Sequence, residues 1–403
     1  MNRFYKYSLL FILIAQSSIP FFFGNEYLIA GFIYSFILFL SINKSVDKYI
    51  ILYSAIFISL FILHFFFADE FVASLMVGYV IRIFFAYFTI RVIGVDFSKY
   101  VVNIIYFFTV VSFFFYVPLS LIPGLQNITT SLYYNVFKGL EVYPDNFRIN
   151  IILYTPDYWL NWIPPRNAGP FWEPGGFATF LVVAVILNFY ETKKMFDKKN
   201  IVFIIALLTT FSTAAYILLS IILVLYFLSK RNFRSIAIAL PFIIFLSYFG
   251  YYQLPFLQEK IDLQFTQFSL YGNSYSERTR IASTYYDIQA IISNPIIGKG
   301  RVERDEFERD VNGFTALVKQ FGLIGLLTYF GFIYLSLKKK AIMQNLSNEW
   351  IFYSVIILAS NGLSQSIFGK PFFISLAFIY ATLPFVKNKI NSQHNDYKTA
   401  PSI

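Results

Sequence analysis

Residues 166–187 read RNAGPFWEPGGFATFLVVAVIL. The stretch begins with an Arg and a Glu held among Gly, Pro and aromatic residues, and it ends in a long apolar run. A helix needs roughly 17–25 mostly apolar residues to cross the hydrocarbon core of a bilayer. The stretch therefore predicts a membrane-spanning helix that begins near Pro174, with a charged pair, Arg166 and Glu173, at its mouth.

Apolar runs of similar length recur along the whole chain. Of its 403 residues, 57% are hydrophobic and 13% charged, and 51 Phe and 31 Tyr exceed what one water-soluble core can bury. Soluble domains carry about a quarter charged residues. We therefore predict an all-α, polytopic integral membrane protein. The predicted spans are 8–24, 27–42, 49–67, 71–93, 100–123, 174–190, 235–253, 313–336, 350–367 and 371–386.

The stretch 200–229 is predicted to enter and leave the membrane on the same side. Clusters of Lys and Arg flank it at both ends, and such clusters mark cytoplasmic turns. Small and hydroxyl residues at 209–215 (TTFSTAA) suit a tight turn between two short helices buried among other helices. This hairpin brings the prediction to about twelve membrane segments, with both termini in the cytoplasm.

Two long loops, on the outer side in this layout, divide the chain. Within the second of them, Ile281, Tyr285, Ile288 and Ile292 recur at helical spacing, which predicts an amphipathic helix over 277–293 along the membrane surface. The predicted divisions are an N-terminal membrane bundle (1–123), the first loop (124–172), central segments with the hairpin (173–253), the second loop (254–312), C-terminal segments (313–387) and a cytoplasmic tail (388–403).

The composition argues against several kinds of chemistry. The chain has no Cys and only two His, so thiol catalysis, disulfides, a His-rich metal site and a Ser-His-Asp triad are not expected. Its net charge of +10 comes largely from Lys and Arg in short turns between spans. That pattern is typical of topology signals and does not indicate nucleic-acid binding.

The charged pair in the quoted stretch has two interpretations. Arg166 can reach lipid head groups while Glu173 caps the helix that starts at Pro174. Alternatively the pair forms a site at the outer membrane face. The planar fork of an Arg suits phosphate, and a carboxylate in a dry aromatic setting can have a raised pKa and accept a proton near neutral pH. Gly175 and Gly176 would then let a substrate approach the backbone closely.

Further polar residues are candidates for the same site. Arg278 and Arg280 in the second loop form either a surface ion cluster or additional phosphate ligands. Arg82, within a span, is costly unless it faces a partner or a cavity, so a structural pair and a substrate contact both stay open. Asn312 is predicted to cap the helix after the second loop, and Gly322 in that helix is predicted to allow close helix packing.

Several of these stretches together resemble the O-antigen polymerase (Wzy) family, within the superfamily that also contains the O-antigen ligases. RNAGPFWEPGGFATFL is similar to the motif that closes the first large loop in that family. LLTTFSTAAYILL is similar to its Thr/Ser-rich short helices, and SNPIIGKG followed by NGFTALVKQFGLIGLL resembles the end of the second loop and the following span. The resemblance covers essentially the whole chain and implies a GT-C-like glycosyltransferase with two large periplasmic loops.

The resemblance implies a polymerase of surface polysaccharide in the bacterial inner (plasma) membrane, with its active site facing the periplasm. Donor and acceptor would be glycans on undecaprenyl diphosphate, and a chain-length regulator (Wzz-like) would be a partner besides membrane lipid. Arg166, Arg278 and Arg280 match the Arg positions that hold the donor diphosphate. Because Arg can neutralise the leaving diphosphate, no metal or other cofactor is expected. Arg82, Asn312 and Trp172 complete the candidate substrate-binding set, Trp172 by stacking on sugars.

Two departures from the family pattern matter. Ligases have a His where this chain has Val311, and the common Ser-Arg of the hairpin is Ser212-Thr213 here. The absent His favours a polymerase over a ligase and leaves Glu173 as the expected base for the acceptor hydroxyl, in a reaction with inversion. An O-antigen ligase, a lipid-linked oligosaccharide flippase or other transporter, and a non-catalytic assembly partner remain as alternatives.

Overall fold

The computed structural model describes nine stretches of the chain, together with a few isolated helical positions between 237 and 262. The stretches are 2–42, 45–68, 73–122, 124–138, 150–157, 165–230, 280–300, 312–363 and 365–382. Arg278, most of the predicted span 235–253 and the tail 388–403 lie outside the described residues. Within them, almost all secondary structure is helical, apart from a short antiparallel ladder of β1 (Pro156–Asp157) and β2 (Arg166–Asn167).

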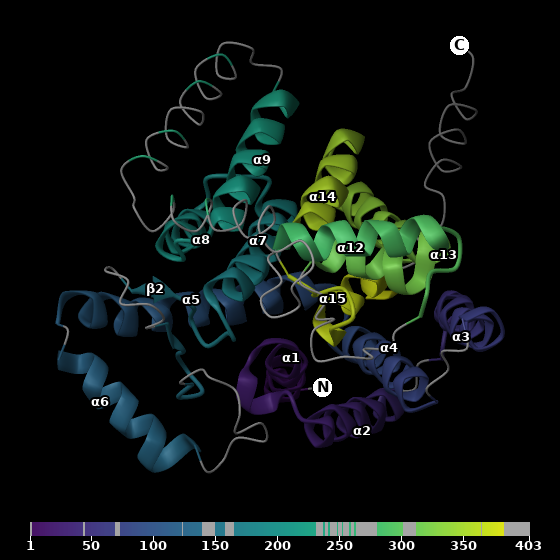
Figure 1. The fold of residues 1–403 in the computed structure, drawn as a ribbon, viewed down its shortest axis with the longest axis horizontal. Coiled ribbons are helices and arrows are strands. Elements are labelled where there is room, and N and C mark those ends of the chain that lie inside the picture. The colour runs from purple at the N-terminus through teal and green to yellow at the C-terminus, as the bar shows by residue number, and fades with distance from the viewer. Residues whose placement is uncertain are drawn as a thin grey trace, which may run out of the picture.

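Figure 1 shows how the helices are arranged in space. Their bounds are α1 (Arg3–Ser18), α2 (Asn25–Ser41), α3 (Lys48–Ala68), α4 (Ala73–Ile93), α5 (Phe97–Leu121), α6 (Gly124–Leu132), α7 (Pro174–Thr192), α8 (Lys198–Thr209), α9 (Thr213–Ser229), α12 (Arg280–Ser293), α13 (Gly313–Met343), α14 (Asn348–Asn361) and α15 (Pro371–Ser375). A π-helix (Tyr133–Phe137) follows α6, and a 3-10 helix (Leu376–Thr382) continues α15.

Four stretches of the described residues are long and apolar enough to cross a membrane. They are Lys48–Phe67, Ala73–Leu121 (which comprises α4 and α5), Pro174–Thr192 and Gly313–Met343. The all-α fold and the apolar helices of a membrane-embedded protein are therefore present, while the count of about twelve segments stays a prediction. Two predicted spans end earlier than expected. Helix α1 ends at Ser18, just before Pro20, and α14 ends at Asn361.

The centre of the molecule is α7, which Figure 1 shows between its neighbours. It packs against α5, α8, α9 and α14, and nearly all of its side chains are buried. The surrounding helices instead expose large apolar side chains, such as Phe66, Phe114 and Leu327. An exposed apolar surface of this kind is stable in lipid, where it costs no hydration free energy.

The helices have two distinct ends. The backbone N–H of Trp172 donates to Ser18 O at 3.1 Å, which joins the start of α7 to the end of α1. We call this the motif end. At the opposite end, Lys340 Nζ lies 2.6 Å from Glu191 Oε1 and joins the ends of α13 and α7. We call this the basic end. Lys and Arg gather there, namely Arg3, Lys6, Lys48, Arg91, Lys99, Lys193, Lys194, Lys198, Lys199, Lys338, Lys339 and Lys340.

Two helices joined by a tight turn are present at the predicted hairpin, while its entry and exit on one side of the membrane stay a prediction. Helices α8 and α9 pack against each other, and the turn between them holds Phe211 at a φ of 44°. At the start of α8, the side chain of Asp197 accepts hydrogen bonds from Asn188 Nδ2 at 3.2 Å and from the N–H of Lys199 at 3.3 Å. Because these bonds favour the charged carboxylate, they lower the pKa of Asp197.

Helix α13 is broken at Gly322, where φ is 62° and ψ is −166°. Residues 295–300, near the end of the second predicted loop, form four backbone hydrogen bonds with α13 on either side of the break. Lys299 N and Gly300 N donate to the carbonyls of residues 319 and 320 at 2.7 and 3.2 Å. Leu323 N and Ile324 N donate to the carbonyls of residues 295 and 296 at 2.9 and 3.2 Å. The prediction of close helix packing at Gly322 is therefore wrong, because a loop approaches this residue and interrupts the helix.

Candidate functional site

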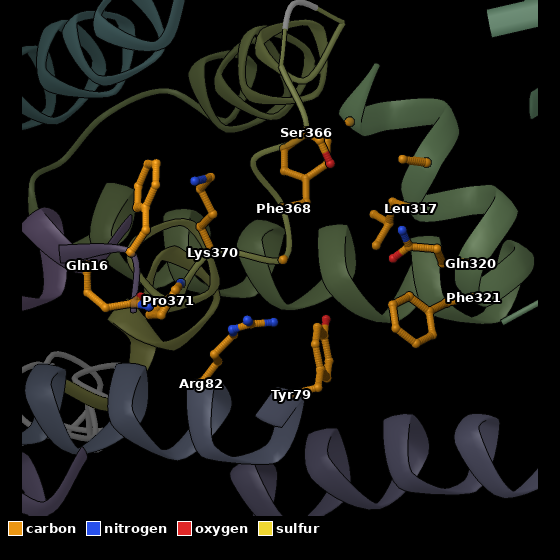
Figure 2. A pocket seen from close by; sticks show the side chains of 14 residues that line it. Gln16, Tyr79, Arg82, Leu317, Gln320, Phe321, Ser366, Phe368, Lys370 and Pro371 are labelled. Atoms are coloured by element: carbon orange, nitrogen blue, oxygen red, sulfur yellow. The ribbon is translucent and has the colours of Figure 1, made fainter. Parts of the chain in front are cut away.

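A cavity of about 200 Å³ opens at the motif end, between α1, α4, α13 and the loop before α15. Its polar lining includes the long side chains of Gln16, Arg82, Gln320 and Lys370, and Ser366, aromatic and aliphatic residues complete it. Figure 2 shows Arg82 rising from α4 toward the loop that carries Lys370, while Gln320 faces the same space from α13. The cavity thus combines two cations with two neutral amides.

Arg82 is the charged residue that α4 presents to this cavity. It lies in the middle of α4, two turns from either end, and is half-buried. A cation at such a position is costly unless it faces a partner or a polar cavity, and the lining of this cavity meets that requirement. Tyr79, one turn earlier, lines the same wall.

Lys370 is held between two aromatic rings. Its Nζ lies 4.4 Å from the ring centroid of Phe23 and 4.5 Å from that of Trp172. Cation–π contacts of this kind fix the direction of a long side chain that otherwise rotates freely. Lys370 was not among the predicted site residues, although it is the basic residue of a short turn on the predicted outer side, where cations are scarce.

Trp172 links Lys370 to the start of α7. Its Nε1 donates to Gln365 Oε1 at 3.3 Å. A Cβ added to Gly176 would lie 2.7 Å from the indole ring, so only a glycine in the first turn of α7 leaves room for this side chain. The expectation that Gly176 opens the backbone to a substrate is therefore wrong, because the indole fills that space.

Glu173 is the N-cap residue of α7 by its backbone, since Phe177 N donates to Glu173 O at 2.9 Å. Its carboxylate makes no capping hydrogen bond to the helix. It accepts a hydrogen bond from Nε2 of Gln365 instead, and Gln365 is buried. The interpretation that the Glu173 carboxylate caps α7 is thus wrong, and Gln365 orients both Trp172 and Glu173.

Arg166 has different partners. It lies in β2, and its Nε donates to Thr210 O in the α8–α9 turn at 3.3 Å. The neighbouring Asn167 is buried and donates to Ser112 Oγ and to Thr209 Oγ1, each at 3.1 Å. Strand β2 therefore connects the α8–α9 turn to α5. Glu173, seven residues after Arg166, contacts the loop before α15 instead. Asn167 was not predicted as a site residue, because only the fold shows its buried hydrogen-bond partners.

Asn312 caps α13, as predicted. Its Oδ1 accepts from the N–H of Phe314 at 3.0 Å and of Thr315 at 3.3 Å, and its Nδ2 donates to Thr284 Oγ1 of α12 at 3.2 Å. The next residue, Gly313, lines the cavity. Asn312 therefore stabilises the first turn of α13, the helix that forms this wall of the cavity, and ties it to α12. Arg280 begins α12, and its side chain lies outside the described part of the structure.

A buried ion pair also holds this wall. Asp287 of α12 is only 3% exposed, its Oδ1 lies 2.9 Å from Lys319 Nζ, and its Oδ2 accepts from Thr315 Oγ1 at 2.6 Å. Residues 315 and 319 lie on one side of α13, and Ala316 and Gln320 line the cavity on another. The pair therefore couples α12 to the helix that forms the cavity wall.

Removing Asp287 is expected to destabilise the protein. Asp287→Ala removes the ion pair with Lys319 and the hydrogen bond from Thr315 in a mostly buried place, which costs about 3 kcal/mol of unfolding free energy. Thermal and denaturant unfolding in detergent would measure the loss. The double variant Asp287→Ala/Lys319→Met should recover part of it, and Ser293→Ala, on the exposed side of α12, should change nothing. Equal stability of Asp287→Ala and the wild type would contradict this account.

Comparisons of the chain with protein-family profiles, with curated proteins and with solved structures find no match. Among the described residues, no group of three or more His, Cys, Asp or Glu can hold a metal ion. The cavity offers two cations, and the Glu173 carboxylate is linked to it through Gln365, the neighbour of the lining residue Ser366. This arrangement can bind an anionic group and accept a proton beside it.

Proposed function

We propose that this protein is a membrane glycosyltransferase that joins glycan units carried on undecaprenyl diphosphate, as the O-antigen polymerases do. The observation that carries the proposal is the cavity with Arg82 and Lys370 in its lining. Departure of a lipid diphosphate develops negative charge, and fixed cations stabilise it in a site from which water is largely excluded. The forked guanidinium of Arg82 suits phosphate oxygens in particular.

The size of the cavity supports a head group as its occupant. Sites for drug-sized ligands measure roughly 300–1,000 Å³, and this cavity has a volume of about 200 Å³. It therefore suits a diphosphate with part of one sugar, while the rest of the glycan extends outward. In the proposal, Arg166 and the second-loop residues Arg278 and Arg280 bind further along the donor.

The proposed reaction uses Glu173 as the base. The acceptor hydroxyl attacks the anomeric carbon of the donor sugar, a new C–O bond forms, and the C–O bond to the diphosphate breaks with inversion. The hydroxyl proton passes to the Glu173 carboxylate, which Gln365 orients through its hydrogen bond. Trp172 and Asn312 hold the walls of the site, and the charge of the leaving diphosphate is balanced by the Arg and Lys side chains.

The distribution of basic residues supports an orientation for this site. Short turns rich in Lys and Arg stay in the cytoplasm, so the basic end is assigned to that side. The motif end, with the cavity, then faces the periplasm across the bacterial inner membrane. Lipid-linked glycans and a chain-length regulator would meet the protein there.

A glycan ladder tests the function. Deletion of the gene in its host, followed by complementation with the wild type or with Arg166→Ala, would be read by separating the surface glycans by size. For a polymerase we expect collapse to a single repeat unit, which the variant does not repair. Long glycans that persist on their lipid carrier but fail to reach their final acceptor would identify a ligase instead.

Glu173→Gln is expected to lower polymerisation by at least roughly 10²-fold, the usual contribution of a general base. The amide keeps the size of the side chain but cannot accept the proton. Polymerisation of purified lipid-linked repeat units in proteoliposomes would measure the rate. Glu349→Gln, at an exposed acid of the basic end, is the matched control. An unchanged rate in Glu173→Gln would remove Glu173 from the mechanism.

A lipid-linked oligosaccharide transporter is the second candidate, and the break in α13 is the observation that favours it. Transporters often bind substrates at discontinuous helices. Here, however, four of the backbone groups around Gly322 are bonded to the segment 295–300. Deletion of a transporter would leave single repeat units on the cytoplasmic side of the membrane, whereas deletion of a polymerase would leave them on the periplasmic side.

A further inference from the structure

Helix α12 has the reverse of the polarity expected for a helix on a water-soluble surface. Its side toward α13 buries Ser283 and Asp287, while Tyr285, Ile288 and Ile292 point outward, Ile292 with 73% of its surface exposed. A helix in water normally buries its apolar stripe and exposes its charges. The predicted amphipathic helix therefore exists, but its apolar side faces away from the protein.

Polar bonds keep the helix in this orientation. Thr284 Oγ1 accepts from Asn312 Nδ2, and Asp287 is bonded to both Thr315 and Lys319. Rotation of α12 about its axis, which would bury the apolar stripe, would separate Asp287 from Lys319 and break the ion pair. The outward direction of the stripe is thus a stable property of the fold.

The exposed stripe continues onto a helix long enough to span a membrane. Ile296, after the end of α12, is 62% exposed, and its carbonyl accepts from Ile324 N of α13. The neighbouring side chains Leu323 and Leu327 are exposed on α13, Leu327 by 70%. One apolar surface therefore runs from α12 across the segment 295–297 onto the apolar span α13.

We propose that α12 is a membrane-surface helix whose side chains Tyr285, Ile288 and Ile292 are seated in the acyl chains of one leaflet. The occupant of this face is lipid, because the face is apolar and continuous with that of a membrane span. Amphipathic helices at an interface bury their apolar side by about 5–10 Å. The carbonyl of Gln320, a cavity residue, accepts a hydrogen bond from Gly300 N, so the segment that follows α12 is attached to the cavity wall.

Fluorescence quenching tests the proposal, since the chain has no Cys to remove. The variants Ile288→Cys and Ile292→Cys would each be labelled with an environment-sensitive fluorophore and reconstituted in phosphatidylcholine vesicles. Quenching by nitroxides on the lipid chains would be compared with quenching by iodide in water. Asn345→Cys, in the exposed turn between α13 and α14, is the matched control. Lipid nitroxides should quench both α12 probes several-fold more than iodide does, and the control should show the reverse.

Either of two results overturns the proposal. Quenching of both α12 probes by iodide and not by lipid nitroxides would mean that the stripe faces water. Weak quenching by both agents would mean that protein covers the stripe. Both substitutions are at exposed side chains, and each labelled protein must elute as the wild type does. Should one variant misfold, Tyr285→Cys on the same face replaces it. The outcome is independent of the glycan ladder, which tests the proposed enzymatic function.

Discussion

Gly322→Ala is expected to cause a large loss of stability. The backbone at Gly322 lies in a region of φ and ψ that is essentially restricted to glycine, and another residue there costs about 1–3 kcal/mol. In addition, the new Cβ would overlap the carbonyl of Ile296. Displacing that segment weakens up to four backbone hydrogen bonds, each worth about 0.5–1.5 kcal/mol. We therefore expect a loss of at least about 3 kcal/mol of unfolding free energy.

The same helix offers a matched control. A Cβ at Gly331 meets open space, so Gly331→Ala should leave stability unchanged or raise it by up to about 1 kcal/mol through helix propensity. Thermal unfolding in detergent, together with limited proteolysis of the segment 295–300, would compare the two variants. Similar stability of Gly322→Ala and Gly331→Ala would show that α13 is continuous and that the observed break is wrong.

Arg82→Gln is expected to have a large effect on activity. If the cavity stabilises the leaving diphosphate, loss of this cation should lower the rate of polymerisation by roughly 10²–10³-fold, as removal of one preorganised donor does elsewhere. The rate of Arg82→Lys should fall between those of Arg82→Gln and the wild type, because Lys keeps the charge but loses the bidentate fork. The rates would be measured in proteoliposomes with purified lipid-linked repeat units.

A basic residue elsewhere on α4 provides the control for this experiment. Arg91, at the basic end of α4, donates to the carbonyls of Ser45 and Ala381. Arg91→Gln should therefore affect stability, while the rate per folded molecule stays that of the wild type. An Arg82→Gln protein that polymerises normally, with unchanged unfolding, would exclude the cavity as the diphosphate site.

The predictions that hold are those that depend on neighbours in the sequence. The apolar runs predict helices of membrane length, since hydropathy acts residue by residue. The Thr/Ser-rich stretch predicts the turn between α8 and α9, and Asn312 predicts a cap, because both act within one helical turn. The spacing of Tyr285, Ile288 and Ile292 likewise predicts an amphipathic helix, whichever way its apolar side faces.

The all-α class with apolar, membrane-length helices, most of the helices and one residue of the cavity lining, Arg82, could thus be predicted from the sequence. That Arg82 and Lys370 share one cavity, that Gln365 holds Glu173, and that α12 turns its apolar side outward became visible only in the fold. The physical reason is the same in each case. These contacts join residues far apart in the chain, and their free energy depends on which polar groups find partners when the helices pack. Periodicity in one segment carries no information about the partner that another segment supplies.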